Sequence, residues 1–426
     1  MDFLRASAIT VVVLGHWLMA APTMGPLEFT LSDMLHVSPW TQWLTWGFQV
    51  MPVFFLVGGW VNATSWQSAR RDGRGYGAWI SHRLQRLVWP LVPFVLVWAA
   101  LAIAAPRLGL DETLVRSGSR IAFVPTWFLA VYLLVVVLAP AMHRLWERWG
   151  WAGFGVLVGA AAVVDGVVAF TGQDAVRWLN YVFVWLALHH LGFAWQSGRL
   201  AASRRCLALA GVGLLTLVLL VTVASYPVSM VTVPEEPAAN ANPPTLALLA
   251  LGVAQAGLLL SWEETGRRWL RRPGPWAATV RVNGVILTVY LWHASVMVTL
   301  VALAEWPGGI GLGFEPGTAV WWATRPAWIL ALLMGLLVFV AAFGRVEARP
   351  NLWLESPPGA WRSALGALLT CVGLVGLSAG GVTGTGPLGL RVEPVLAALA
   401  GVALVVVRPS RGQPAAPVSS ESPTTR

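Results

Sequence analysis

Apolar runs long enough to cross a lipid bilayer recur along almost the whole chain. A membrane-spanning helix needs about 20 apolar residues, because the hydrocarbon layer is about 30 Å thick and a helix rises 1.5 Å per residue. The pattern therefore predicts an all-α, polytopic membrane protein with twelve transmembrane helices. The expected spans are residues 6–22, 43–64, 87–105, 124–142, 151–170, 178–196, 206–224, 245–262, 282–303, 323–343, 364–381 and 392–408.

Composition agrees with this class and sets an orientation. The chain is 57% hydrophobic and 11% charged, whereas soluble domains carry about 25% charged residues. All 28 basic residues are arginines, and 22 of them fall on one side of the twelve predicted spans if the N-terminus is cytoplasmic. Basic residues concentrate in cytoplasmic loops, so both termini are expected in the cytoplasm and the protein in the inner or plasma membrane. The six arginines expected on the opposite side are Arg107, Arg116, Arg120, Arg177, Arg325 and Arg391.

Several bulk features exclude other functions. The net charge of +9 lies mostly on the predicted membrane-facing inner surface, which favours lipid contact over nucleic-acid binding. The first span begins at residue 6 with no cleavage pattern after it, and we interpret it as a retained helix. Cys206 and Cys371 fall at or inside predicted helices, so we expect small buried residues and not redox chemistry. The loop 231–245 is expected to be aqueous, and the tail 409–426 to be disordered.

Arg5 and His16 are the most informative pair in the chain. Eleven helical steps of about 100° come close to three full turns, so both side chains point from one helix face, about 16 Å apart along the axis. An ionisable side chain inside a membrane is costly and usually faces a bundle interior or a cavity, where it carries function. The alternative is a packing histidine whose hydrogen bonds are satisfied within the bundle.

Five separated segments resemble acyltransferase family 3, a family of integral-membrane enzymes that move acyl groups onto sugars, glycans and other hydroxyl acceptors. Asp2-Phe-Leu-Arg5, followed after ten residues by His16, is similar to the first signature of that family. The other four segments are Pro52-Val-Phe-Phe-Leu-Val-Gly-Gly-Trp60, Ser81-His-Arg-Leu-Gln-Arg-Leu87, Thr126-Trp-Phe-Leu129 and Tyr290-Leu-Trp-His293. The resemblance implies a ten-helix acyltransferase domain over residues 1–345.

The chain also departs from the family. Gly58-Gly59 stands where the family usually has Ser-Gly, which removes a hydroxyl from the second span. Residues 346–408 add a cytoplasmic loop and two further helices, to which the resemblance assigns no role. No hydrolase-like soluble domain is expected after the last span, where the sequence continues with the tail 409–426.

Acyl transfer requires a group that takes the proton of an acceptor hydroxyl. A neutral imidazole suits this at neutral pH, so His16 is the expected base, or alternatively the nucleophile that carries the acyl group itself. Arg5 is expected to anchor a phosphate or polarise a thioester carbonyl. The resemblance implies an acyl-coenzyme A donor, acetyl-coenzyme A above all, as a co-substrate. Arg83 and Arg86 are expected to meet its phosphates, or instead to contact lipid phosphates.

Further polar positions lie inside or next to the predicted spans. The resemblance implies that His293 faces the same cavity as His16; the alternative is a local polar contact near Thr288 or Ser295. Asp2, which opens the first signature, joins the expected substrate-binding residues. Asp165 is expected to pair with an arginine or histidine of another helix. His189 and His190 point about 100° apart, which argues against haem or metal binding, and no permanently bound cofactor or metal is expected.

Some motifs have simpler explanations. Gly376-Leu-Ser378-Ala-Gly380 matches a nucleophile elbow, but that motif needs a strand-to-helix turn and this one lies in a predicted helix. Asn62-Ala-Thr64 matches a glycosylation site, yet it falls at the cytoplasmic end of a span. Gly155 and Gly159 are interpreted as positions where two helices pack closely.

The expected function is a membrane-bound O-acyltransferase. It would move an acyl group from acyl-coenzyme A to a hydroxyl of a glycan, a cell-envelope polysaccharide or a small metabolite. The alternative is a secondary transporter, because twelve spans with both ends inside are common there and Arg70-Arg-Asp-Gly-Arg74 lies between the second and third spans. The short loop between spans six and seven and the lack of similarity between the halves argue against it. A scaffold or sensor would leave the aligned Arg5 and His16 unexplained.

Overall fold

The computed structural model describes residues 1–24, 29–200, 204–234, 236–305, 308–348 and 358–406. Helices form nearly all of its regular structure, as the apolar runs predict. The amino-terminal half contains α1 (Asp2–Met19), β1 (Ala20–Met24), β2 (Phe29–Asp33), α2 (Met34–Val37), η1 (Pro39–Leu44), α3 (Thr45–Phe48), α4 (Met51–Arg71), α5 (Tyr76–Val88), α6 (Leu91–Ala104), η2 (Ala105–Leu108), α7 (Glu112–Phe123), α8 (Thr126–Trp149), α9 (Trp151–Thr171) and η3 (Asp174–Leu179). The remainder contains α10 (Asn180–Gln196), α11 (Arg204–Thr222), α12 (Leu246–Ser261), α13 (Glu263–Trp269), α14 (Pro273–Asn283), α15 (Ile286–Glu305), α16 (Ala319–Ala348), α17 (Ala360–Gly380), η4 (Pro387–Gly389) and α18 (Val392–Val406).

The molecule is a polytopic membrane protein by the length and composition of its helices. Nine helical segments of the described chain are long and apolar enough to cross a membrane, or ten if α12 and α13, bent by 55°, form one span. Every predicted span falls on a helix, but the count of twelve is not confirmed. The helix α18, with 15 residues, is shorter than a bilayer crossing requires, and α10, with 17 residues, is not among these segments. The predicted disordered tail 409–426 lies outside the described residues.

The first helix ends earlier than predicted. It stops at Met19, three residues before Pro22, which cannot continue a helix because its ring blocks the backbone hydrogen bond. The strands β1 and β2 follow and pair antiparallel, with Ala20 opposite Asp33. This small hairpin is an addition to the expected all-α fold, and it closes the end of α1 that carries His16.

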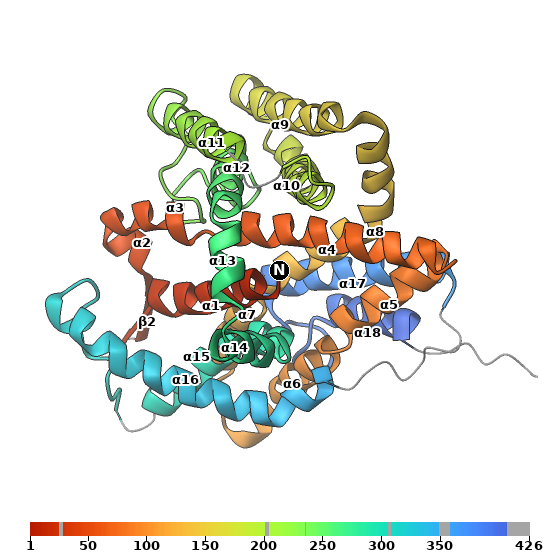
Figure 1. Ribbon diagram of the computed structural model, residues 1–426. Helices are drawn as coiled ribbons and strands as arrows, with labels where there is room; N and C mark the ends of the chain where they lie inside the picture. Colours follow the sequence, from red (N-terminus) through yellow and green to blue (C-terminus); the bar gives the residue numbers. More distant parts are fainter. Residues whose placement is uncertain (25–28, 201–203, 235, 306–307, 349–357, 407–426) are drawn as a thin grey trace, which may run out of the picture.

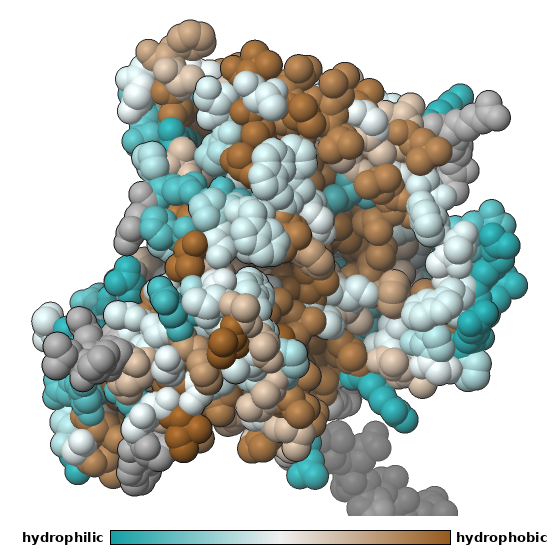
Figure 2. Space-filling view, turned by 90° about the vertical axis from the view of Figure 1, so that its left-hand side faces the viewer, coloured by the Kyte–Doolittle hydropathy of each residue, from teal (hydrophilic) through white to brown (hydrophobic). Residues whose placement is uncertain are grey.

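The helix α1 runs through the middle of the bundle (Figure 1), and it contacts α4 on one side and α14 and α15 on the other. The helices α9 to α12 form a group on the far side of α4, and α17 and α18 lie against α5 and α8. Figure 2 views the end where β2 and α2 lie. Hydrophilic side chains gather at its margins, and hydrophobic ones cover much of the surface between them. The central place of α1 puts both Arg5 and His16 inside the bundle.

Glycines allow α4 and α10 to touch through their backbones. A β-carbon at Gly59 would overlap the carbonyl oxygen of His189, and one at Gly192 would overlap the carbonyl of Leu56. Gly59 is thus required by packing. The departure from the family pattern is at its neighbour Gly58. The interpretation of Gly155 and Gly159 was wrong, because a β-carbon at either position would meet open space.

Candidate functional site

His16 and His293 form a pair between α1 and α15. The Nδ1 atom of His16 lies 2.8 Å from Nε2 of His293, and the two rings stack with centroids 5.1 Å apart. His293 is completely buried, and His16 is half-buried. The indole nitrogen of Trp17 donates to the backbone carbonyl of His293 at 3.0 Å, which ties the two helices together beside the pair.

Hydrogen bonds determine which ring nitrogen of each histidine carries the proton. The Nδ1 atom of His293 lies 2.6 Å from the carbonyl oxygen of Tyr290, and because a carbonyl only accepts, Nδ1 must donate. In neutral His293 the Nε2 atom then carries a lone pair and accepts from Nδ1 of His16. The proton of His16 is therefore on Nδ1, which leaves its Nε2 with a free lone pair. That is the tautomer a base or a nucleophile needs.

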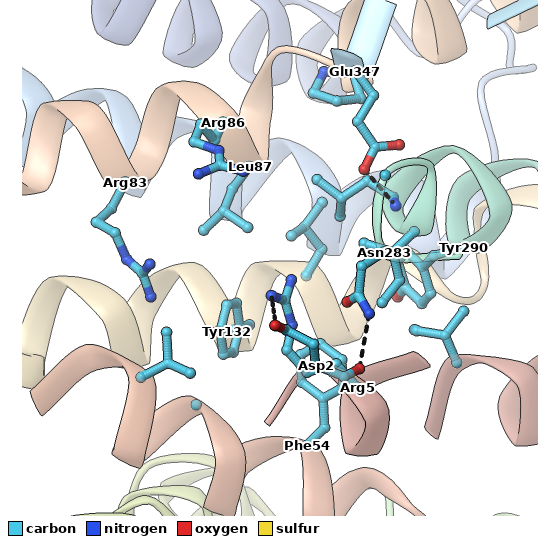
Figure 3. Close-up of a pocket in the computed structure, with 18 of the residues that line it drawn as sticks. Asp2, Arg5, Phe54, Arg83, Arg86, Leu87, Tyr132, Asn283, Tyr290 and Glu347 are labelled. Carbon is cyan, nitrogen blue, oxygen red and sulfur yellow. Dashed lines mark hydrogen bonds and ion pairs between the residues drawn. The ribbon is translucent and has the colours of Figure 1, made fainter. Parts of the chain in front are cut away.

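A pocket of about 780 Å³ lies at the other end of α1. Figure 3 shows the guanidinium groups of Arg5, Arg83 and Arg86 pointing into one space, with the ring of Tyr132 beside them. The predicted binding residues Asp2, Arg5, Arg83 and Arg86 all line this pocket. Asp2 and Arg5 make a loose ion pair of 3.9 Å, and both are partly exposed, so Arg5 keeps much of its charge available.

Arg83 is held in place by a contact that the sequence did not suggest. Its guanidinium donates to the side-chain oxygen of Asn62 on α4, and the amide nitrogen of Asn62 lies 3.1 Å from Nε2 of His189 on α10. Asn62 is 1% exposed, so the glycosylation-site motif carries no glycan. The one feature of the sequence that indicates a role for Asn62 is its position as a polar residue inside an apolar run. Arg86, in contrast, is exposed.

Glu347 is a pocket residue that the sequence analysis missed. Its carboxylate accepts from the backbone nitrogens of Leu287 and Thr288, at 3.0 and 2.7 Å, and from the Thr288 hydroxyl at 2.8 Å. These nitrogens belong to the first turn of α15, where helix N–H groups lack partners within the helix and favour a negative charge. Glu347 therefore caps the helix that carries Tyr290 and His293, and the dashed line at its carboxylate marks the bond from the backbone nitrogen of Leu287 (Figure 3).

The histidine pair and the pocket are separate features of the structure. Neither His16 nor His293 lines the pocket, which ends at Ile9 on α1 and Tyr290 on α15. Ile9 lies seven residues from His16, about 10 Å along the helix. The two histidines therefore meet each other away from this pocket, and whether they also face one cavity stays a prediction. Aromatic rings close this end of the pocket, because Phe128 packs against Phe54, Tyr132 and Tyr290.

Asp165 and Arg325 correct two further expectations. Asp165 accepts from Asn180 at 2.7 Å, Tyr226 at 2.8 Å and the backbone nitrogen of Leu246 at 2.9 Å, and not from an arginine or histidine of the described chain. It ties α9 to α10 and α12. Arg325 was counted with the outer loops, at the edge of the predicted span 323–343, but it is 4% exposed inside α16, which begins at Ala319. Its guanidinium lies 4.2 Å from the ring centroid of Trp321.

The remaining motifs are structural. Gly376 and Ser378 lie within α17, where the Ser378 hydroxyl donates to the carbonyl of Val375, so the nucleophile-elbow pattern carries no nucleophile.

Cys206 is buried and Cys371 half-buried, and the thiol of Cys371 donates to the carbonyl of Ala130. Arg70 and Arg74, in the basic loop that favoured a transporter, pair with Glu147 and Asp72.

Comparison with known proteins decides the family. The family model for the acyltransferase domain of acyltransferase family 3 matches residues 1–344. The chain belongs to this family. Comparisons with curated proteins and with solved structures gave no match. The match confirms the resemblance and makes the protein a membrane acyltransferase. The acyltransferase domain contains the histidine pair and the arginines of the pocket, and it ends before α17.

Proposed function

We propose that this acyltransferase moves an acetyl group from acetyl-coenzyme A to a hydroxyl of a glycan, a cell-envelope polysaccharide or a small metabolite. The hydrogen-bond chain from the Tyr290 carbonyl through His293 to His16 is the observation that carries the proposal. It leaves Nε2 of His16 unprotonated and oriented by a buried partner. Family membership supplies the reaction class, and this geometry supplies the base.

The reaction needs one proton transfer to His16. The acceptor hydroxyl oxygen attacks the thioester carbonyl carbon while Nε2 of His16 takes its proton. The new C–O bond forms, the C–S bond breaks, and coenzyme A leaves as a thiolate that takes up the proton from Nε2 of His16, which restores the neutral base. Positive charge on His16 is shared with His293 through the 2.8 Å contact, and the Tyr290 carbonyl stabilises it.

The pocket at the other end of α1 is the proposed donor site. Arg5, Arg83 and Arg86 are available to the phosphate groups of coenzyme A, and guanidinium groups bind phosphate with two hydrogen bonds each. The side of the membrane where arginines concentrate is cytoplasmic by the positive-inside rule, which agrees with a cytoplasmic donor in the inner membrane. From this pocket the acyl arm would have to pass the aromatic rings around Phe128 to reach His16.

Transfer of radiolabelled acetyl tests the proposal. Membranes with the wild type, His16→Ala or Arg5→Ala at matched expression are given labelled acetyl-coenzyme A, and label is followed in glycans and small metabolites. His16→Ala is expected to lower transfer about 10²- to 10⁴-fold, the usual contribution of a general base. His36→Ala, at an exposed histidine outside the pair, is the control.

Two results have distinct meanings. Equal transfer by the wild type and His16→Ala across several acyl donors would overturn the proposed function. Label that stays on the protein and is lost in His16→Ala would keep the function and make His16 the acyl carrier in place of the base.

A further inference from the structure

The helices α17 and α18 form a hairpin outside the family domain, which ends at residue 344. They pack against each other through small residues, since a β-carbon at Gly373 would overlap Ala398. The hairpin also docks on the domain, where the Thr126 hydroxyl lies 3.4 Å from the carbonyl of Leu374 and Cys371 contacts Ala130. The two helices are thus part of one body with the acyltransferase domain.

The hairpin holds the helix that carries the pocket arginines. The Ser81 hydroxyl on α5 lies 2.7 Å from the Ser363 hydroxyl on α17 and 2.9 Å from the carbonyl of Pro358. One turn along α5, the amide nitrogen of Gln85 donates to the carbonyl of Val405 on α18 at 3.2 Å. Ser81, Gln85 and Ser363 are all buried. Polar contacts inside an apolar bundle fix the orientation of a helix, because a rotation would leave their groups unpaired.

These contacts set where Arg83 and Arg86 point. Ser81 and Gln85 are four residues apart and share a face of α5, whereas Arg83 is about 200° from Ser81 around the helix. Because these contacts prevent α5 from rotating, they also fix the directions of Arg83 and Arg86, which lie on other faces of the same helix. The end of α18 also enters the pocket itself, since Val406 is among the lining residues.

We infer that the α17–α18 hairpin is part of the donor site. Its polar contacts with α5 position the arginines, and Val406 supplies a section of apolar wall beside Leu87 and Pro90. The ligand it serves is the proposed donor, a phosphate-bearing acyl thioester, so the inference rests on the proposed function. Donor affinity, and not the chemical step at His16, is what the hairpin controls.

A large side chain at the end of α18 tests whether Val406 forms part of the apolar wall of the donor pocket. Val406→Trp is expected to raise the KM for acetyl-coenzyme A at least fivefold while kcat stays within twofold. Leu396→Trp is the matched control, because Leu396 lies on the same helix with 59% of its surface exposed, and its KM should equal that of the wild type. An unchanged KM in Val406→Trp, or a fall of kcat alone, would overturn the inference.

A double-mutant cycle tests whether the contact between Ser81 and Ser363 positions the arginines of α5. Ser81→Ala and Ser363→Ala are each expected to raise the KM severalfold at constant kcat, and the double variant should be no worse than the worse single one, because both remove the same hydrogen bond. Effects that multiply, or that appear in kcat, would contradict positioning through this contact.

Binding of coenzyme A to the purified protein separates this inference from the proposed function. His16→Ala and Leu396→Trp should bind coenzyme A as the wild type does, and Val406→Trp should bind at least fivefold more weakly. If the wild type does not bind coenzyme A, the proposed donor is wrong. If the wild type and Val406→Trp bind it equally, the donor stands and the role of the hairpin is wrong.

Discussion

The Nε2 atom of His293 lies 2.8 Å from Nδ1 of His16, although 277 residues separate them in the chain. His293 is thus the partner that orients His16, and its own Nδ1 is held by the Tyr290 carbonyl. The first prediction follows from this order of donors and acceptors.

His293→Ala is expected to lower kcat for acetyl transfer about tenfold, the equivalent of one hydrogen bond of about 1.4 kcal/mol. His293→Gln should lose less, because its side-chain oxygen can still accept from Nδ1 of His16. The KM for acetyl-coenzyme A should not change in either variant, since His293 does not line the pocket. A loss in His293→Ala equal to that in His16→Ala would instead make His293 a reacting group.

Asn62 gives the second prediction, on donor binding. Asn62→Asp places a carboxylate against the guanidinium of Arg83 and is expected to raise the KM for acetyl-coenzyme A about tenfold or more, because a charge-assisted hydrogen bond to phosphate is worth about 1.5–3 kcal/mol. Gln67→Glu on the same helix is the control, since Gln67 contacts His143 and Gln196 and lies outside the pocket lining. Equal KM values in the two variants would show that Arg83 does not bind the donor.

Features of the site that lie within one helix can be predicted from the sequence, whereas contacts between distant helices cannot. The alignment of Arg5 with His16 follows from helix periodicity alone, and the arginines of α5 were expected from a motif. The contact of Asn62 with His189 and the cap by Glu347 join residues 127 and about 60 positions apart. Such pairings depend on which helices become neighbours, and spacing rules do not specify that.

The boundaries of helices show the same limit. Every predicted span falls on a helix, but the span predicted to begin at residue 323 belongs to α16, which already begins at Ala319 and buries Arg325 within its second turn. In the folded protein the guanidinium lies against Trp321, so burial of the charge depends on a neighbour on the same helix face. The helix α10 was counted as a span, yet its 17 residues, with two adjacent histidines, are not among the helical segments long and apolar enough to cross a membrane.

Gly59 gives the third prediction, on stability. Gly59→Ala is expected to lower the free energy of unfolding by about 1–3 kcal/mol, because its β-carbon would overlap the backbone of α10 and force two helices apart. Gly155→Ala is the matched control, since the same change there meets open space and should be neutral or stabilising. Thermal unfolding in detergent measures both. A Gly59→Ala midpoint equal to that of Gly155→Ala would contradict the contact between α4 and α10.

Glu347 gives the fourth prediction, which links the two ends of α15. Glu347→Ala removes the cap from Leu287 and Thr288 and is expected to cost about 0.5–2 kcal/mol of stability, as loss of a helix cap does. The same helix holds His293 against His16, so kcat should fall together with the thermal midpoint. Glu347→Gln retains an oxygen acceptor and should recover most of both losses, whereas Glu315→Ala, at an exposed carboxylate, should change neither. If Glu347→Ala lowers stability at unchanged kcat, the cap does not position the histidine pair, and the orientation of His293 must come from its contacts with Tyr290 and Trp17 alone.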